Sequence, residues 1–374
     1  MGWWCLRSPG SVHTGGGAPG RPRNYQRRAS RFSGAALRPG ERGGPAQYGG
    51  GVVMTRAWRN GTAAERDFPV ARVSDLVAGP DTFVWVDHTD PRPEDLADLE
   101  DELGVHALAV EDALEAGQRP KLDRYRESLF LVVYDVTGRT DEGDLVTHEV
   151  KAFVTKRALV TIHGADVDLH DVEHRLEANA DIADHGVPWL MWALLDTVVD
   201  HASDVVEALD QQVSALEDDL FEHGSSRERQ IQRRSFALRK QLGVLRRLVV
   251  PTRDSVTSVL HGDADLVVDG IRPYFRDVQD HLVTIADSVE QLREAVSSVL
   301  DTNLGIASNH QNDVMKKVTS WAAIIAIPTA ITGFFGQNVP FPGNGTWGGV
   351  VASVGLIVAS SLVLYRVFKT KDWL

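Results

Sequence analysis

Cysteine is almost absent from this chain, and its scarcity removes several classes of protein at once. The 374 residues contain one cysteine, Cys5. A single cysteine excludes an intrachain disulfide framework and any zinc or iron–sulfur site built from several thiolates. Neither GxGxxG nor GxxxxGK(S/T) occurs between a strand-like and a helix-like segment, so a nucleotide-binding fold has no direct support. No catalytic triad or carboxylate pair can be argued from the sequence either, and we expect no enzyme.

Charged residues are missing from a long stretch near the C-terminus. Residues 318–365, 48 in all, contain no Asp, Glu, Lys, Arg or His. A membrane-spanning helix needs about 20 apolar residues, so this stretch accommodates two spans and a loop. We predict transmembrane helices at 318–336 and 348–368, joined by a loop at 337–347 and followed by a basic tail at 369–374. The alternative is a buried hairpin in a soluble protein, which the length of the charge-free stretch disfavours.

The charges that flank the two predicted spans indicate an orientation. Basic residues precede the first span and follow the second: Lys316, Lys317, Arg366, Lys369 and Lys371. The loop between the spans carries no charge. Because short basic segments stay on the cytoplasmic side, we expect a multi-pass protein of the cell membrane with both termini in the cytoplasm.

Acidic residues dominate the rest of the chain. Residues 1–53 hold eight arginines and one acid, a net charge of +7, whereas the whole chain has a formal net charge of −13. The remainder therefore carries −20, which argues against a nucleic-acid partner and favours attraction of cations. We predict that the Gly-, Pro- and Arg-rich residues 1–66 form a disordered extension. Met54 is an alternative start, because sequence typical of a folded protein begins only after it.

A cytoplasmic α/β domain is predicted at residues 67–167. Four segments are rich in β-branched and aromatic residues, at 82–87, 129–136, 149–154 and 158–163. They alternate with helix-like segments at 93–103 and 107–116, a pattern typical of a mostly buried sheet. Residues 168–272 are predicted to be helical, with long helices at 189–222 and 227–249 and an interruption at Pro251.

A long stalk helix is predicted at residues 273–317. Apolar residues recur at alternating steps of four and three: Val278, Leu282, Ile285, Val289, Leu292, Val296 and Val299. This seam indicates either an ordinary core-facing helix or a helix packed against copies of itself or its neighbours. Beyond it the sequence turns polar: Thr302, Asn303, Ser308, Asn309, His310, Gln311, Asn312 and Asp313. We interpret the polar stretch as the lining of a water-filled axis.

Small residues follow one face of the first predicted span: Ala322, Ala326, Thr329, Gly333 and Gly336. Such a face serves either as a dimerisation surface or as the lining of a narrow path, and the polar stretch below it favours the path. With no charged ring in the membrane, selectivity must come from amide, hydroxyl and carbonyl oxygens. The available groups belong to Gln337, Asn338, Thr329, Asn312 and the backbone near Gly336. Magnesium keeps several of its waters, so amide oxygens that bind those waters suit a hydrated divalent ion.

Four motifs, in order along residues 67–374, resemble those of CorA-type magnesium transporters. PTAITGFFGQN at 328–338 resembles the family segment in which a Gly-Met-Asn triplet closes the first membrane helix. KDWL at 371–374 resembles the family's basic, Trp-containing tail. Two cytoplasmic signatures also match, through Glu111, Asp112, Gln118, Arg119, Pro120, Lys121 and Tyr125, and through Tyr274, Phe275, Arg276 and Asp277 up to His281.

The resemblance implies a homopentamer with a cytoplasmic α/β domain, a stalk helix and two membrane helices per chain. It places Gly336, Gln337 and Asn338 at the selective entrance, with the Asn338 amide facing hydrated Mg²⁺. The pore-lining positions are Asn312, Met315, Val318 and Thr329. Asp277, with Asp112 of an adjacent subunit, is implied to bind regulatory Mg²⁺ that closes the pore. The alternative is that both aspartates form ordinary salt bridges.

Two departures from the family pattern leave the transported ion open. Gln337 replaces the methionine of the triplet, and the loop lacks the acidic residue of many members. A zinc-transporting branch, of the ZntB type, has the same architecture and a variable triplet. Mg²⁺ is the first expectation, with Co²⁺, Ni²⁺ or Zn²⁺ as alternatives. A rival interpretation is a membrane-anchored signalling or scaffold protein that conducts nothing.

Overall fold

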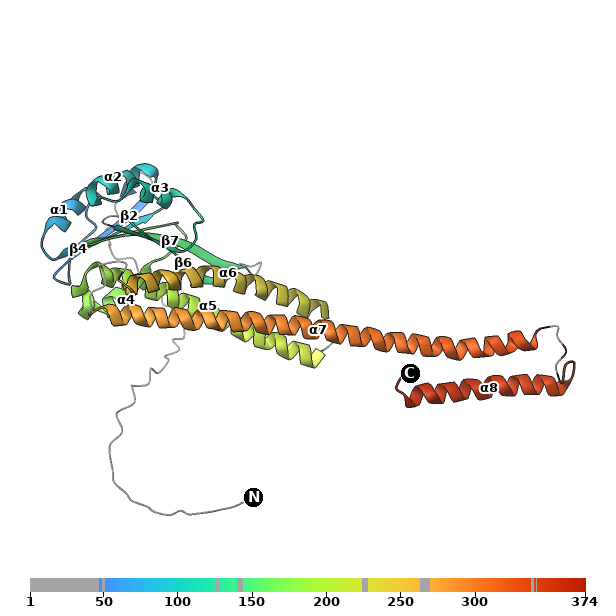
Figure 1. The fold of residues 1–374 in the computed structure, drawn as a ribbon. Coiled ribbons are helices and arrows are strands. Elements are labelled where there is room, and N and C mark those ends of the chain that lie inside the picture. Colours follow the sequence, from blue (N-terminus) through green and yellow to red (C-terminus); the bar gives the residue numbers. More distant parts are fainter. Residues whose placement is uncertain are drawn as a thin grey trace, which may run out of the picture. The chain divides into compact units, whose positions relative to one another are not determined.

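The computed structural model describes residues 47–48, 51–125, 128–139, 144–223, 228–262, 270–337, 340 and 342–374 (Figure 1). The order of elements matches the expected organisation: a sheet with short helices first, then long helices, then two apolar helices at the C-terminus. The fold is therefore an α/β domain followed by a helical stalk and a membrane hairpin.

A single mixed sheet forms the centre of the N-terminal domain. Its strands are β1 Gln47–Tyr48, β2 Gly51–Arg59, β3 Thr62–Arg66, β4 Thr82–Thr89, β5 Lys121–Arg124, β6 Ser128–Arg139, β7 Leu145–Thr155 and β8 Ala158–His163. Their order is β1-β2-β4-β8-β7-β6-β5, and β3 pairs with β2 outside this path. Strands β4 and β8 are parallel, whereas the other described pairs are antiparallel. The four predicted strands correspond to β4, β6, β7 and β8.

The predicted disordered extension ends too late. Residues 51–66 form β2 and β3, and β2 pairs with β4 along its length, from Val52 opposite Thr89 to Arg59 opposite Thr82. The Gly-, Pro- and Arg-rich composition of the preceding residues misled the prediction, although β2 itself carries apolar residues. Ala57 is 2% exposed and Trp58 7%, and the Trp58 ring packs against Phe83 of β4 and Trp189 of α5. Met54 lies inside β2. Residues 1–46 are outside the described part of the chain.

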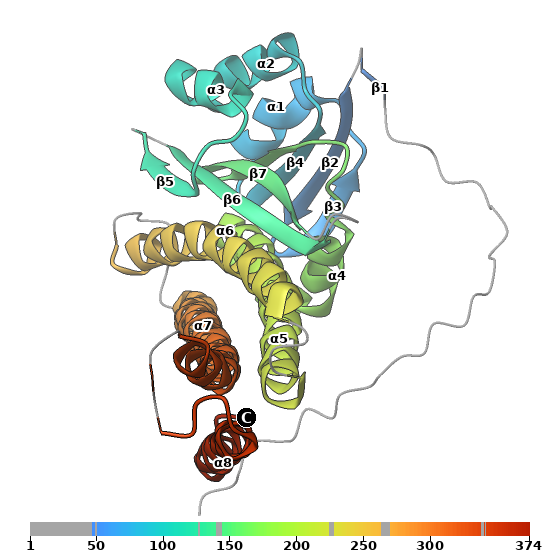
Figure 2. The same cartoon turned by 90° about the vertical axis from the view of Figure 1, so that its right-hand side faces the viewer.

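Helices cover both faces of the sheet, because alternate residues of each strand point to opposite sides. Val84 and Val86 of β4 face the short helices α1 Val73–Ala78, α2 Pro93–Leu103 and α3 Ala107–Leu114, and all three helices lie on one side (Figure 2). Trp85 belongs to the other core, which includes residues of α4 His170–Ala178 and α5 Val187–His223. Short 3-10 turns at Val70–Arg72 and Ala180–His185 precede α1 and α5.

Three long helices pack together below the sheet. They are α5, α6 Glu228–Leu260 and α7 Arg272–Phe335. All seven residues of the predicted apolar seam are buried, between 0% and 7% exposed, in the core that α7 shares with α5 and α6. Within one chain the seam therefore packs against the chain's own neighbouring helices.

The predicted interruption at Pro251 is wrong, because α6 continues to Leu260. Proline inside a helix removes one N–H and crowds the preceding turn, at a cost of about 3 kcal/mol. Val256 and Val259 beyond it are each 1% exposed, and their burial offsets this cost. The Thr252 hydroxyl also donates to the Leu248 carbonyl at 2.8 Å, in the turn next to the proline.

The stalk and the first predicted span are one helix, since α7 runs for 64 residues without a break. Helix α8, Trp347–Thr370, corresponds to the second predicted span and packs against α7. Both helices are long and apolar enough to cross a membrane, and 6% and 0% of their most apolar windows are buried. Such exposed apolar surface is expected for helices whose surroundings are lipid or other subunits.

Candidate ion pathway and regulatory metal site

The predicted pore-lining residues all lie on exposed surface of α7. Asn312 and Thr329 are exposed, Met315 is 60% exposed and Val318 59%. The Thr329 hydroxyl donates to the Ile325 carbonyl at 2.9 Å, so its oxygen lone pairs remain available as acceptors. Trp373 of the C-terminal tail lies beside this surface, in a pocket that Asn312 and Met315 also line. The pathway residues are therefore free of contacts that would prevent them from facing water or another subunit.

One member of the polar stretch does not belong with the others. Asn303 follows Val299 by one helical turn and is 2% exposed, with no hydrogen-bond partner for its Oδ1 atom in the described structure. It continues the packed seam instead of an open axis, contrary to our interpretation of the whole stretch. Thr302 and residues 308–313 are all exposed, so Asn303 is the buried exception among the polar residues named for this stretch.

The predicted entrance lies where α7 ends. Gly336 closes the helix through a hydrogen bond from its N–H to the Thr332 carbonyl at 2.9 Å, and the exposed Gln337 follows. Asn338 lies outside the described residues. A pocket of about 640 Å³ separates this end of α7 from the turn at residues 343–346 and the start of α8. The Thr346 side chain caps α8 by accepting a hydrogen bond from Gly349 N–H.

A close contact between Gly349 and the Gly343 backbone holds this turn on α8. A Cβ atom on Gly349 would lie 3.1 Å from the Gly343 carbonyl carbon and closer still to its oxygen. We expect Gly349→Ala to displace the turn and to lower the free energy of unfolding by about 1–3 kcal/mol, with slower ion uptake. The matched control is Gly355→Ala on the same helix, where a Cβ meets nothing within 4 Å. Equal thermal midpoints for the two detergent-solubilised variants would contradict the expectation.

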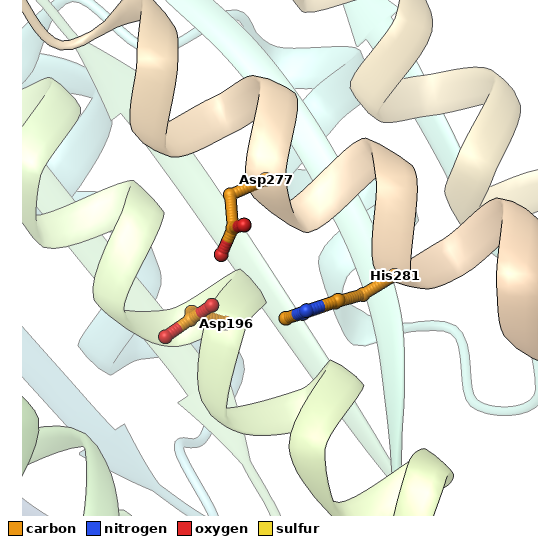
Figure 3. A group of neighbouring side chains, drawn as sticks. All are labelled: Asp196, Asp277 and His281. Carbon is orange, nitrogen blue, oxygen red and sulfur yellow. The ribbon is translucent and has the colours of Figure 1, made fainter. Parts of the chain in front are cut away.

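Asp277 lies in a group of three possible metal ligands. One ligand atom from each of Asp196, Asp277 and His281 lies within 4.8 Å of the other two. Figure 3 shows the Asp196 carboxylate on one helix turned toward Asp277 and His281, which project from successive turns of another. The set contains hard carboxylate oxygens, which suit Mg²⁺, and one imidazole, which suits Co²⁺, Ni²⁺ and Zn²⁺.

Aromatic packing sets the register that brings these ligands together. Phe275 is fully buried, and Tyr274 packs against Trp192 of α5 with ring centroids 5.3 Å apart. Trp192 lies one turn before Asp196, and Tyr274 lies three residues before Asp277. The Tyr-Phe pair of the second cytoplasmic signature therefore anchors α7 on α5, while Arg276 stays exposed.

Sequence reasoning identified Asp277 and missed its two neighbours. His281 carried a detectable signal, since Asp277 and His281 occupy positions i and i+4 of a predicted helix. Asp196 carried none, because its proximity to Asp277 depends on how α5 packs against α7. Asp112 is not part of the group within one chain.

Asp112 forms an ion pair inside its own chain. The Lys121 ammonium lies 2.6 Å from Asp112 Oδ2 and 2.7 Å from Asp123 Oδ2. Burial alone would lower the pKa of Lys121, but the hydrogen bonds to these two carboxylates raise it above its ordinary value. Within one chain, Asp112 therefore forms the ordinary salt bridge that the alternative predicted. Asp277 has no ion pair within 4 Å among the described residues.

The rest of the first signature fixes the loop after α3. The Glu149 carboxylate accepts hydrogen bonds from the N–H groups of Gly117 and Gln118, at 2.9 and 3.0 Å. The Tyr134 hydroxyl donates to the Gln118 carbonyl, and burial together with Glu149 raises the pKa of Tyr134 to about 12. The Gln118 side chain donates to the Asp112 carbonyl at 2.7 Å. Pro120 is buried, while Glu111 and Arg119 are exposed.

Known proteins share this architecture and much of this sequence. The family described as CorA-like Mg²⁺ transporter protein matches residues 80–370. The cobalt/magnesium transport protein CorA of Thermotoga maritima is 31% identical over 317 residues, which cover 83% of this chain and 89% of that protein. The chain belongs to the CorA family. Members of this family are transporters, and the chain is accordingly a divalent-cation transporter of the CorA family.

Two further relatives bear on the fold and on the ion. The complete structure of the CorA magnesium transporter from Methanocaldococcus jannaschii matches with a TM-score of 0.72 at 20% identity, covering 86% of this chain and 98% of that one. This likeness confirms the fold of a CorA chain. The zinc transport protein ZntB of Cronobacter sakazakii is 29% identical over 274 residues, which cover 71% of this chain and 80% of that protein.

Proposed function

We propose that this CorA-family chain forms a homopentameric, gated channel that carries hydrated Mg²⁺ across the cell membrane, with both termini in the cytoplasm. The observation that carries the proposal is the continuity of α7, which runs as one helix from before Asp277 to Phe335, the residue that precedes Gly336. An event at the cytoplasmic end is thereby transmitted to the membrane end through a single helix, which contains one internal proline, Pro328.

The chemistry of the path favours a hydrated ion. Waters bound to Mg²⁺ donate hydrogen bonds and need acceptors, and magnesium gives up these waters reluctantly. The Thr329 hydroxyl already donates to the helix backbone and is left as an acceptor. Asn312 and Asn338 add amide oxygens, so rings of neutral acceptors replace the charged rings of other cation channels.

Gating is proposed to depend on a divalent ion bound near Asp277. Asp196 and His281 complete a three-residue set on α5 and α7, and Asp112 of an adjacent subunit is the proposed fourth group. An ion bound there holds neighbouring chains together in the closed state. Loss of the ion at low cytoplasmic Mg²⁺ shifts the population toward the open state.

Zinc transport is the second candidate. It is favoured by the ZntB relative and by Gln337 in place of the methionine of the triplet. Membership of a transporter family weighs against the non-conducting scaffold.

Ion flux into liposomes tests the proposal directly. Purified full-length protein is reconstituted with a Mg²⁺-sensitive dye inside, and Mg²⁺, Co²⁺, Ni²⁺ and Zn²⁺ are added in turn. We expect saturable Mg²⁺ entry that hexa-ammine cobalt, a mimic of the hydrated ion, blocks. Zinc entry with little Mg²⁺ entry would favour the zinc-transporter alternative. Absence of flux for all four ions would contradict the proposal of a channel.

A further inference from the structure

Two carboxylates of the proposed regulatory site already hold a basic residue of their own chain. Lys121 pairs with Asp112, and Arg175 of α4 pairs with Asp196. The two pairs lie on different elements, and neither basic residue belongs to the set of metal ligands.

The Arg175 pair is partly shielded from solvent. The Arg175 side chain is 21% exposed and that of Asp196 13%. One guanidinium nitrogen, Nη1, contacts Asp196 Oδ2, and the other, Nη2, lies 2.5 Å from Asp200 Oδ2. Because an arginine stays protonated in proteins, this positive charge remains beside Asp196 at every physiological pH.

The Lys121 pair is held as firmly. Asp112 and Asp123 flank the ammonium, which also lies 5.4 Å from the centre of the Phe130 ring. The carboxylates raise the pKa of Lys121 despite its partial burial, so the lysine stays charged. Each side of the proposed interface therefore brings its own cation.

We propose that Lys121 and Arg175 are internal counter-cations that oppose divalent-ion binding at the cytoplasmic site and so set the Mg²⁺ concentration at which it fills. The inference rests on the regulatory site of the proposed function. With these residues in place, the empty site holds partly neutralised carboxylates and not a bare acidic cluster. A divalent ion that binds there must then either displace Lys121 and Arg175 from the carboxylates of Asp112 and Asp196, or bind beside the two cations against their repulsion.

Two opposing effects of each basic residue have to be compared. Hydrogen bonds that orient a ligating carboxylate typically improve metal affinity by about 10–100-fold. A fixed positive charge a few ångströms from a divalent ion has the opposite sign, and Coulomb repulsion doubles with the charge of the ion. Repulsion and competition dominate, because Lys121 Nζ lies 2.6 Å from Asp112 Oδ2 and Arg175 Nη1 contacts Asp196 Oδ2, so each cation occupies a carboxylate oxygen of a proposed ligand. The site also favours divalent ions over K⁺, because the Coulomb attraction between the carboxylates and a doubly charged ion is twice that for a singly charged ion.

The test is a Mg²⁺ titration of full-length protein in lipid nanodiscs, read out by protection from chymotrypsin. Chymotrypsin is chosen because substitutions at lysine or arginine do not alter its cleavage sites. We expect Lys121→Gln and Arg175→Gln each to lower the Mg²⁺ concentration at half-protection by about tenfold. Lys121→Arg and Arg175→Lys retain the charge and are expected to stay near the wild-type midpoint. Arg72→Gln removes an equivalent charge from an exposed pair with Glu65 and serves as the matched control.

The sign of the shift separates the possible roles. A purely orienting role predicts that the glutamine variants need more Mg²⁺, and an unchanged midpoint would mean that the basic residues are irrelevant to the site; either result overturns the inference. Asp277→Ala is titrated in parallel. Protection that survives Asp277→Ala would show that the regulatory site itself is wrong. Protection lost in Asp277→Ala but unshifted in the glutamine variants would contradict the counter-cations alone.

Discussion

Asn338→Ala is expected to reduce Mg²⁺ uptake to the rate of protein-free liposomes while the oligomer still assembles. The two membrane helices offer no charged side chain between residues 318 and 365, so neutral oxygens must recognise the ion. In a pentamer one substitution removes five amide oxygens from the entrance at once. In the sequence, position 338 follows Phe335, the last residue of α7. Dye-based flux and size-exclusion chromatography measure the two outcomes.

Two further variants give the Asn338 result its meaning. Asn344→Ala removes an amide from the same loop, beside the pocket at the start of α8, and is expected to transport normally. Gln337→Met restores the family triplet and is expected to keep Mg²⁺ uptake. Wild-type uptake by Asn338→Ala would refute recognition at this residue, and a loss shared by Asn344→Ala would point to disruption of the loop.

Asp277→Ala is expected to erase the protection that millimolar Mg²⁺ gives the cytoplasmic domain against proteolysis. Asp277 is the carboxylate of the ligand group without an ion pair among the described residues, and it contributes oxygen, which Mg²⁺ prefers. Its removal leaves Asp196, which Arg175 engages, and His281, a nitrogen ligand that suits Mg²⁺ poorly. The measurement is the digestion pattern across a Mg²⁺ titration.

A control on the same helix separates the loss of a metal ligand at Asp277 from the loss of one negative charge. Asp287 is exposed and lies on α7 beyond the ligand group. Asp287→Ala is expected to retain protection. An identical digestion pattern in Asp277→Ala and wild type would refute the assignment, and loss in both alanine variants would indicate a diffuse acidic surface.

Much of the architecture could be predicted because its signals are local. Strands β4, β6, β7 and β8 contain segments rich in β-branched and aromatic residues, and all six residues of β8 are buried. Strands β2 and β3 were not predicted because they follow a Gly-, Pro- and Arg-rich segment and are fixed by pairing, β2 with β4 and β3 with β2. The continuation of α6 through Pro251 could not be predicted either, because what stabilises the helix beyond the proline is the burial of Val256 and Val259 in the tertiary structure.

The candidate site shows the same division. Asp277 was found through the motif that resembles the family, and His281 stands one helical turn away from it. The role of Asp112 as a metal ligand stays a prediction, because it concerns a contact between subunits. The ion pairs of Asp112 with Lys121 and of Asp196 with Arg175 had no sequence signature, since an acid and a base distant in sequence meet only after packing.

Two features could be predicted from patterns along the chain: two C-terminal helices that suit a membrane, and an apolar seam on the stalk. The first follows from a long absence of charge and the second from a repeat of four and three. Packing in three dimensions was needed to show that the seam faces α5 and α6, that Asn303 is buried, and that Asp196 lies beside Asp277 and His281. The physical reason is that a helix has several faces, and the partner elements determine which of them is buried and which side chains come into contact.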